Sequence, residues 1–203
     1  MKIICIGRNY AEHAKEMNAP VPSEPVFFLK PDTAQIKNNL PFYYPDFSKE
    51  IHHEVELVLK INKPGKNIDI QFANKYYDEI GIGIDFTARD IQAKCKEKGL
   101  PWEKAKAFDG SAPIGKFIDK KKIVDLNAIN FNLKINGKTV QIGNTKDLLF
   151  SFDAVIAYVS KFFTLKKGDL IYTGTPEGVG PVVIGDTLEA SIENEPLLTF
   201  EIK

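Results

Sequence analysis

Residues 53–61 alternate apolar and other side chains, and this period of two limits the fold more than any other feature of the sequence. One side of an extended chain would carry His53, Val55, Leu57, Leu59 and Ile61, and the other would carry Glu54, Glu56, Val58 and Lys60. Residues 79–85 repeat the pattern, with Ile80, Ile82 and Ile84 on one side and Gly81, Gly83 and Asp85 on the other. The sequence therefore predicts two β-strands, each with an apolar face.

Strands dominate the rest of the sequence as well, and helices are few. We expect strands over residues 26–29, a hairpin over 133–142 around Asn136-Gly137, and antiparallel strands over 188–202. Three helices are expected, over 10–17, from an N-cap at Thr87 to about Lys98, and over 151–163. No shift in composition marks a linker, so we expect one β-rich α+β domain over residues 1–203.

Composition excludes several classes of function. The 27 basic and 27 acidic residues cancel, whereas domains that bind nucleic acid usually carry a basic patch. No run of 18 apolar residues predicts a membrane span. Cys5 and Cys95 occur without a secretory signal, so we expect reduced thiols and a cytoplasmic location. Only Arg8 and Arg89 among the basic residues are arginine, which suggests a specific use for these two guanidinium groups.

Three carboxylates form the first candidate site. Glu54 and Glu56 point to the same side of their strand, and two like charges there are unfavourable unless water or a cation screens them. Asp85 ends the second strand on the face of Gly81 and Gly83, which we expect to leave room for a ligand. If the strands are neighbours, the three carboxylates converge and suit Mg²⁺ or Mn²⁺ better than Zn²⁺. The alternative, a solvated face on an edge strand, remains open from spacing alone.

Two smaller patterns also suggest chemistry. His13 and Glu16 lie three residues apart on a helix, where a carboxylate orients an imidazole for the activation of water; the alternative is an exposed charged helix. Arg89 and Gln92 share a helical face and suit an anionic, oxygen-rich ligand.

Two further segments have a structural and a functional interpretation. The glycine-rich segment 174–180 would offer backbone N–H groups and the Thr175 hydroxyl to a carboxylate, or it forms a tight turn. His52 and His53 point to opposite sides of a strand, so at least one of them is expected to be structural.

Several motifs in order along the chain resemble the fumarylacetoacetate hydrolase family, in particular its short acylpyruvase branch, whose members also decarboxylate oxaloacetate. The motifs are 7–10 (GRNY) with His13, 25–31 (PVFFLKP), 53–57 (HEVEL), 85–90 (DFTARD), 99–102 (GLPW), 105–106 (AK), 173–176 (TGTP) and 178–181 (GVGP). The resemblance covers essentially the whole chain. The segment 108–111 (FDGS) differs, because the animal branch tends to have uncharged residues at the Asp109-Gly110 positions.

The resemblance implies a mixed β-sandwich or roll with a few flanking helices and a short lid helix, assembled as a homodimer. It also implies roles for site residues. Glu54, Glu56 and Asp85 would bind Mg²⁺ or Mn²⁺, His13 and Glu16 would activate water, Lys106 would stabilise negative charge, and Arg8, Lys30, Arg89, Gln92 and Thr175 would bind substrate.

The expected activity is metal-dependent hydrolysis of a C–C bond in acylpyruvates, which yields pyruvate and a carboxylic acid, with decarboxylation of oxaloacetate as a second activity. Three alternatives act on oxaloacetate or dioxo acids from aromatic catabolism: an isomerase, a decarboxylase and a tautomerase. An alternative of another class is a protein that binds a small anionic keto acid through a metal without turnover. The presence of His13, Glu16 and Lys106 argues against that last alternative.

Overall fold

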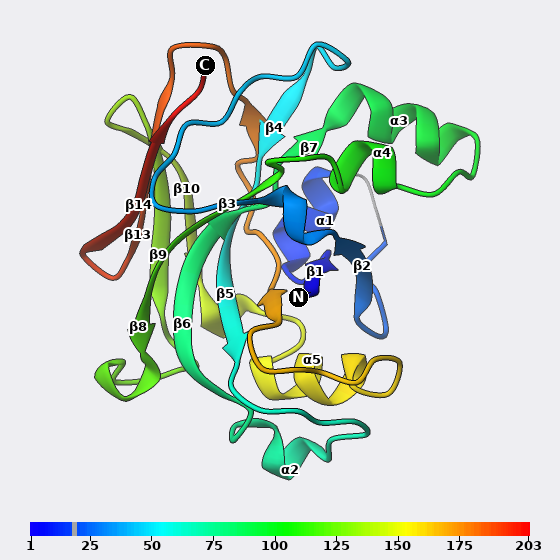
Figure 1. The fold of residues 1–203 in the computed structure, drawn as a ribbon, viewed down its shortest axis with the longest axis vertical. Helices are drawn as coiled ribbons and strands as arrows, with labels where there is room; N and C mark the ends of the chain where they lie inside the picture. Colours follow the sequence, from blue (N-terminus) through cyan, green and yellow to red (C-terminus); the bar gives the residue numbers. More distant parts are fainter. Residues whose placement is uncertain (18–19) are drawn as a thin grey trace.

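The structure is a computed structural model that describes residues 1–17 and 20–203 (Figure 1). The strands are β1 (Ile3–Gly7), β2 (Val26–Lys30), β3 (Gln35–Ile36), β4 (Ile51–His53), β5 (Val55–Ile61), β6 (Tyr77–Ile84), β7 (Thr87–Ala88), β8 (Ala112–Asp119), β9 (Asn130–Ile135), β10 (Lys138–Asn144), β11 (Leu170–Tyr172), β12 (Gly180–Pro181), β13 (Thr187–Ile192) and β14 (Glu195–Glu201). The α-helices are α1 (Ala11–Glu16), α2 (Ile70–Ala73), α3 (Arg89–Glu97), α4 (Glu103–Lys106) and α5 (Phe152–Val159). Single 3₁₀ turns cover Asp32–Ala34, Lys120–Lys122 and Thr145–Asp147.

The described strands form three sheets, in the orders β2-β1-β11-β5-β6-β8-β3, β10-β9-β13-β14 and β12-β4-β7. Figure 1 shows the four-stranded sheet beside the long, curved strands β6 and β8 of the seven-stranded sheet. The main apolar core joins these two sheets, with Ile80 and Ile82 from β6, Leu133 from β9 and Leu188 from β13 all buried. The predicted strand-rich α+β fold with few helices is confirmed.

The predicted strand over residues 53–61 is broken at Glu54. β4 pairs with β7 and β12 in the three-stranded sheet, whereas β5 pairs with β6 and β11 in the seven-stranded sheet. The chain therefore turns from one sheet to another at Glu54, between His53 and Val55. Alternation along the sequence does not reveal this corner, because both halves keep an extended backbone.

The expectation that Gly81 and Gly83 leave room for a ligand is wrong. A β-carbon on Gly81 would lie 2.9 Å from the Phe117 ring, and one on Gly83 would lie 2.7 Å from the Tyr172 ring. Aromatic side chains from β8 and β11 therefore fill this face of β6, and both rings belong to a second, smaller apolar cluster.

The expected helix at residues 10–17 is confirmed as α1, but the other two helices differ from their predictions. Thr87 lies in β7 and does not cap a helix, and α3 begins at Arg89. The helix predicted over 151–163 ends at Val159, because Asn67 and Ile68 donate their backbone N–H groups to the carbonyl and hydroxyl oxygens of Ser160.

The predicted hairpin over 133–142 and the predicted antiparallel strands over 188–202 are confirmed. Asn136 and Gly137 have φ angles of 51° and 78° and connect β9 to β10, as an Asn-Gly turn of type I′ requires. Cys5 and Cys95 are free thiols, as predicted. Among the described residues, no helix is long and apolar enough to cross a membrane.

The close packing of β6 generates a stability prediction. Gly83→Ala should lower the free energy of unfolding by about 1–3 kcal/mol, because the new methyl group meets the Tyr172 ring and the rigid Pro113 carbonyl. Gly7→Ala is the matched control, since a β-carbon there has no neighbour closer than 3.9 Å. Urea denaturation of both variants would measure the difference, and equal stability would contradict this description of β6.

Candidate active site

Strand pairing brings the three carboxylates of Glu54, Glu56 and Asp85 together. Glu56 of β5 lies opposite Gly83 of β6, and the Asp85 backbone N–H donates a hydrogen bond of 2.8 Å to the Glu54 carbonyl. One oxygen from each carboxylate lies within 4.8 Å of the other two, and all three residues are buried. The two strands are neighbours, so the three carboxylates converge as predicted. Because all three residues are buried, the alternative of a solvated face on an edge strand is excluded.

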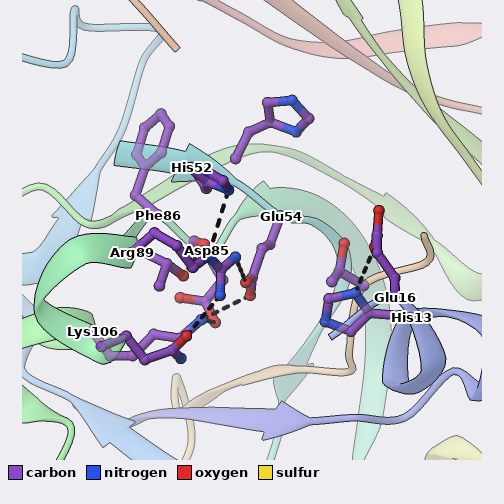
Figure 2. Close-up of polar contacts among 12 residues, drawn as sticks. His13, Glu16, His52, Glu54, Asp85, Phe86, Arg89 and Lys106 are labelled. Atoms are coloured by element: carbon purple, nitrogen blue, oxygen red, sulfur yellow. Dashed lines mark hydrogen bonds and ion pairs between the residues drawn. The ribbon is translucent and has the colours of Figure 1, made fainter. Parts of the chain in front are cut away.

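Two cationic side chains, one from α3 and one from α4, contact this acidic cluster (Figure 2). The Arg89 guanidinium at the start of α3 lies 2.6 Å from Glu54 Oε1. The Lys106 ammonium of α4 lies 2.7 Å from Glu54 Oε2 and 2.8 Å from Asp85 Oδ2. Burial alone would raise the pKa of Glu54, but Lys106 and Arg89 hold it well below its usual range. Glu54 is therefore a stable buried anion.

Glu56 has a different environment. Within residues 1–17 and 20–203, no lysine or arginine forms an ion pair with it, and its Oε2 accepts a hydrogen bond of 2.7 Å from the Gly174 backbone N–H. Burial, followed by the charges of Asp85 and Glu54, raises the pKa of Glu56 well above its usual value. A further positive charge beside Glu56 would remove this penalty.

Asp85 also keeps an oxygen for another partner. The Lys30 ammonium lies 2.6 Å from Asp85 Oδ1, but this buried oxygen accepts no hydrogen bond of normal geometry among the described residues. The contact between Lys30 and Asp85 is therefore an ion pair without a hydrogen bond. Together with Glu54 and Glu56, this gives an all-oxygen donor set, which fits a hard divalent cation such as Mg²⁺ or Mn²⁺.

A cavity opens beside the acidic cluster. The predicted site residues that line it are Arg8, His13, Glu54, Glu56, Asp85, Arg89, Gln92, Lys106 and Thr175. Both arginines of the chain are in this set. Gln92 accepts a hydrogen bond of 2.7 Å from Arg89, which orients the guanidinium toward Glu54.

Lys30 does not line the cavity, although substrate binding was expected of it. Its side chain is fully buried behind Asp85, and its ammonium donates to the backbone carbonyls of Phe86 and Ser111 at 3.2 and 2.7 Å. The structure therefore places Lys30 where it holds Asp85 in position. Sequence spacing does not show this, because β2 and Asp85 are far apart in the chain.

His13 and Glu16 form a pair at the edge of the cavity (Figure 2). His13 Nδ1 lies 3.2 Å from Glu16 Oε2, and His13 lines the cavity while Glu16 does not. The other Glu16 oxygen accepts a hydrogen bond of 3.0 Å from the Gly178 N–H, which ties α1 to the glycine-rich segment. The alternative of a freely exposed charged helix is excluded, because His13 is buried.

Arg8 has a left-handed backbone, with a φ of 59°. Asn9 holds this conformation, because its side chain accepts from the Phe150 N–H and donates to the carbonyls of Phe150 and Thr173. Such strain in a residue other than glycine is typical of functional sites. Asn9 was present in a motif but had no predicted role.

Lys96 and Trp102 also line the cavity and were missed by sequence reasoning. Lys96 lies four residues after Gln92 on α3, so helical spacing could have identified it as part of the same face. Trp102 belongs to the 99–102 motif but had no predicted role, because its position depends on the turn between α3 and α4.

The two adjacent histidines belong to hydrogen-bond networks outside the acidic cluster. His53 is buried and its Nδ1 lies 2.9 Å from Gln141 Oε1. His52 Nε2 lies 3.1 Å from Glu50 Oε1, and its Nδ1 lies 3.4 Å from Arg89 Nε. The prediction that at least one is structural is confirmed for His53.

Comparison with known proteins agrees with this geometry. The family described as fumarylacetoacetate (FAA) hydrolase C-terminal matches residues 2–202. The chain is 46% identical over 201 residues to the mitochondrial oxaloacetate tautomerase FAHD1 of Mus musculus, covering 99% of this chain and 91% of that protein. It is 44% identical over 192 residues to the mitochondrial oxaloacetate decarboxylase of Dictyostelium discoideum, covering 94% of this chain and 88% of that protein.

A solved structure extends the comparison. The fumarylpyruvate hydrolase of Pseudomonas aeruginosa, solved in complex with Mn²⁺ and pyruvate, is 36% identical and superposes with a TM-score of 0.93 over 100% of this chain and 89% of that one. The family match over almost the whole chain, the sequence identities and the shared fold agree with the motifs. This chain belongs to the fumarylacetoacetate hydrolase family.

Proposed function

We propose that the chain is a Mg²⁺- or Mn²⁺-dependent enzyme that interconverts the keto and enol forms of oxaloacetate. One observation carries the proposal: three buried carboxylates, of which Glu56 forms no ion pair among the described residues, open onto a cavity that His13 and Lys106 also line. The relative from Mus musculus is named an oxaloacetate tautomerase, which supports this choice of substrate.

Glu54, Glu56 and Asp85 would hold the cation. When bound, the cation supplies Lewis-acid chemistry, which polarises a keto oxygen and favours the enol form. Arg8, Gln92 and Thr175 line the same cavity and would bind the carboxylates of a small dianion.

His13 would move the proton. If Nδ1 carries the hydrogen that is shared with Glu16, Nε2 is the free base, and it takes a proton from the carbon between the keto group and the distal carboxylate. The same nitrogen then gives that proton to the enolate oxygen, which completes the enol, and Glu16 stabilises the imidazolium in between.

Lys106 would stabilise the enolate oxygen. Burial alone would lower the pKa of Lys106, but Asp85 and Glu54 raise it above its ordinary value. The side chain therefore stays an ammonium group, held by two carboxylates and directed into the cavity.

A second candidate is hydrolysis of acylpyruvates, supported by the fumarylpyruvate hydrolase that was solved with Mn²⁺ and pyruvate. Here His13 would take a proton from water, and the resulting hydroxide attacks the distal carbonyl carbon. The C–C bond then breaks, a carboxylic acid leaves, and the electron pair passes to a pyruvate enolate. Protonation of that enolate completes the reaction.

Removal of the Glu56 carboxylate should have opposite effects on metal binding and on the stability of the metal-free protein. Glu56→Gln should weaken Mn²⁺ binding by about 100-fold or more, because even changes behind a metal ligand cost ~10–100-fold. It should also raise the thermal stability of the metal-free protein, since it removes a buried charge beside two others.

Titration calorimetry and melting curves with Mn²⁺ or EDTA would measure both effects. Glu79→Gln is the matched control, because Glu79 lies on β6 in an exposed pair with Lys60. Unchanged Mn²⁺ affinity in Glu56→Gln would contradict the proposed metal site.

Removal of the His13 imidazole should slow the reactions that need a base and spare the decarboxylation, which does not need one. His13→Ala should slow tautomerisation, and any acylpyruvate hydrolysis, by about 10²–10⁴-fold, the usual contribution of a general base. Decarboxylation of oxaloacetate needs the stabilised enolate but no such base, so it should largely persist. Ultraviolet absorbance of the enol and coupled detection of pyruvate would follow the reactions.

Lys15→Ala on α1 is the control, because Lys15 is exposed and pairs only with Glu12 among the described residues. Equal loss of all three reactions in His13→Ala would refute this division of roles. Wild-type protein that binds Mn²⁺ but turns over neither oxaloacetate nor an acylpyruvate would favour the non-catalytic alternative.

A further inference from the structure

Gln141 of β10 lies behind the candidate active site and links two of its segments. It is only 1% exposed, and its amide contacts the corner between β4 and β5 on one side and the segment after β11 on the other. The first segment carries Glu54, and the second carries Thr175. No motif or spacing in the sequence identified Gln141.

The hydrogen bonds determine which way the Gln141 amide points. Its Oε1 accepts from the Val55 backbone N–H at 3.0 Å, and its Nε2 donates to the Pro176 carbonyl at 2.9 Å. A backbone N–H can only donate and a carbonyl can only accept, so the oxygen and nitrogen cannot be exchanged. His53 Nδ1, 2.9 Å from the same Oε1, must therefore carry a proton.

The amide orientation decides the direction of the Thr175 hydroxyl. The second Nε2 proton of Gln141 is donated to Thr175 Oγ1 at 2.9 Å, so this oxygen is an acceptor toward Gln141. Thr175 is buried and lines the cavity. Within residues 1–17 and 20–203 its own hydroxyl proton has no acceptor, which leaves that proton for a group in the cavity.

We infer that Gln141 is a positioning residue, which forces the Thr175 hydroxyl to act as a hydrogen-bond donor to an anionic oxygen of the substrate. The inference rests on the proposed function, because a keto-acid carboxylate or enolate is the acceptor that such a donor suits. Gln141 is not among the residues that line the cavity. It acts through Thr175, and the same amide also holds the two residues that flank Glu54.

A double-mutant cycle tests this coupling. Thr175→Val removes the hydroxyl and should raise the KM for oxaloacetate, and the Kd of the Mn²⁺-loaded protein for pyruvate, by about tenfold or more. Gln141→Met should have a similar effect alone, because the hydroxyl is then free to turn away. Added to Thr175→Val, it should change these constants by no more than about twofold.

Thr175→Ser restores a hydroxyl, so sensitivity to Gln141→Met should return in that background. If Gln141→Met does not fold, Gln141→Glu is the variant to measure in its place. Its carboxyl keeps the acceptor for His53 and Val55 but presents an oxygen to Thr175, so the hydroxyl should turn toward residue 141 and KM should rise.

Thr145→Val is the control for a loss of buried hydrogen bonds, because Thr145 Oγ1 bonds Ile129 and Leu126 away from the cavity lining. It should lower the melting temperature without a change in KM. The inference would be overturned if Gln141→Met changed KM equally in the wild type and in Thr175→Val. If the wild type is active, this outcome leaves the proposed function intact. A wild type that binds neither Mn²⁺ nor pyruvate and is inactive would overturn the proposed function as well.

Discussion

The interaction on which the site depends is the burial of three carboxylates within a few ångströms of one another. An ionised carboxylate in a protein interior costs several kcal/mol unless it is paired, so Glu54, Glu56 and Asp85 require compensating charge. Lys30, Arg89 and Lys106 supply it for two of them. Glu56 forms no ion pair among the described residues, so it is the carboxylate of this triad that a bound cation would compensate.

The corner at Glu54 makes this arrangement possible. Because the chain leaves the three-stranded sheet and enters the seven-stranded sheet there, Glu54 faces α3 and α4, while Glu56 faces the segment after β11. Gly174 in that segment has a φ of 103°, and a β-carbon there would lie 2.6 Å from the Asn9 side chain. Only glycine allows the backbone N–H to approach Glu56 so closely.

Local patterns predicted the elements whose conformation is set by near neighbours in the chain. The Asn136-Gly137 hairpin, the strand at residues 26–29 and helix α1 were all found where expected, because turn chemistry and side-chain periodicity act over a few residues. The break at Glu54 and the early end of α5 were not predicted. Both depend on hydrogen bonds from distant segments, Gln141 in one case and Asn67 in the other.

Motifs in order along the chain marked the carboxylates, the His13–Glu16 pair and both arginines as candidate site residues before any contact between them was known. How these groups are paired became visible in the folded chain alone. It placed Lys30 behind Asp85, filled the glycine face of β6 with aromatic rings, and left Glu56 without an ion pair in the part of the chain that the structure describes. The physical reason is that the energy of a buried charge depends on the groups within a few ångströms of it, and here those groups come from elements far apart in the chain.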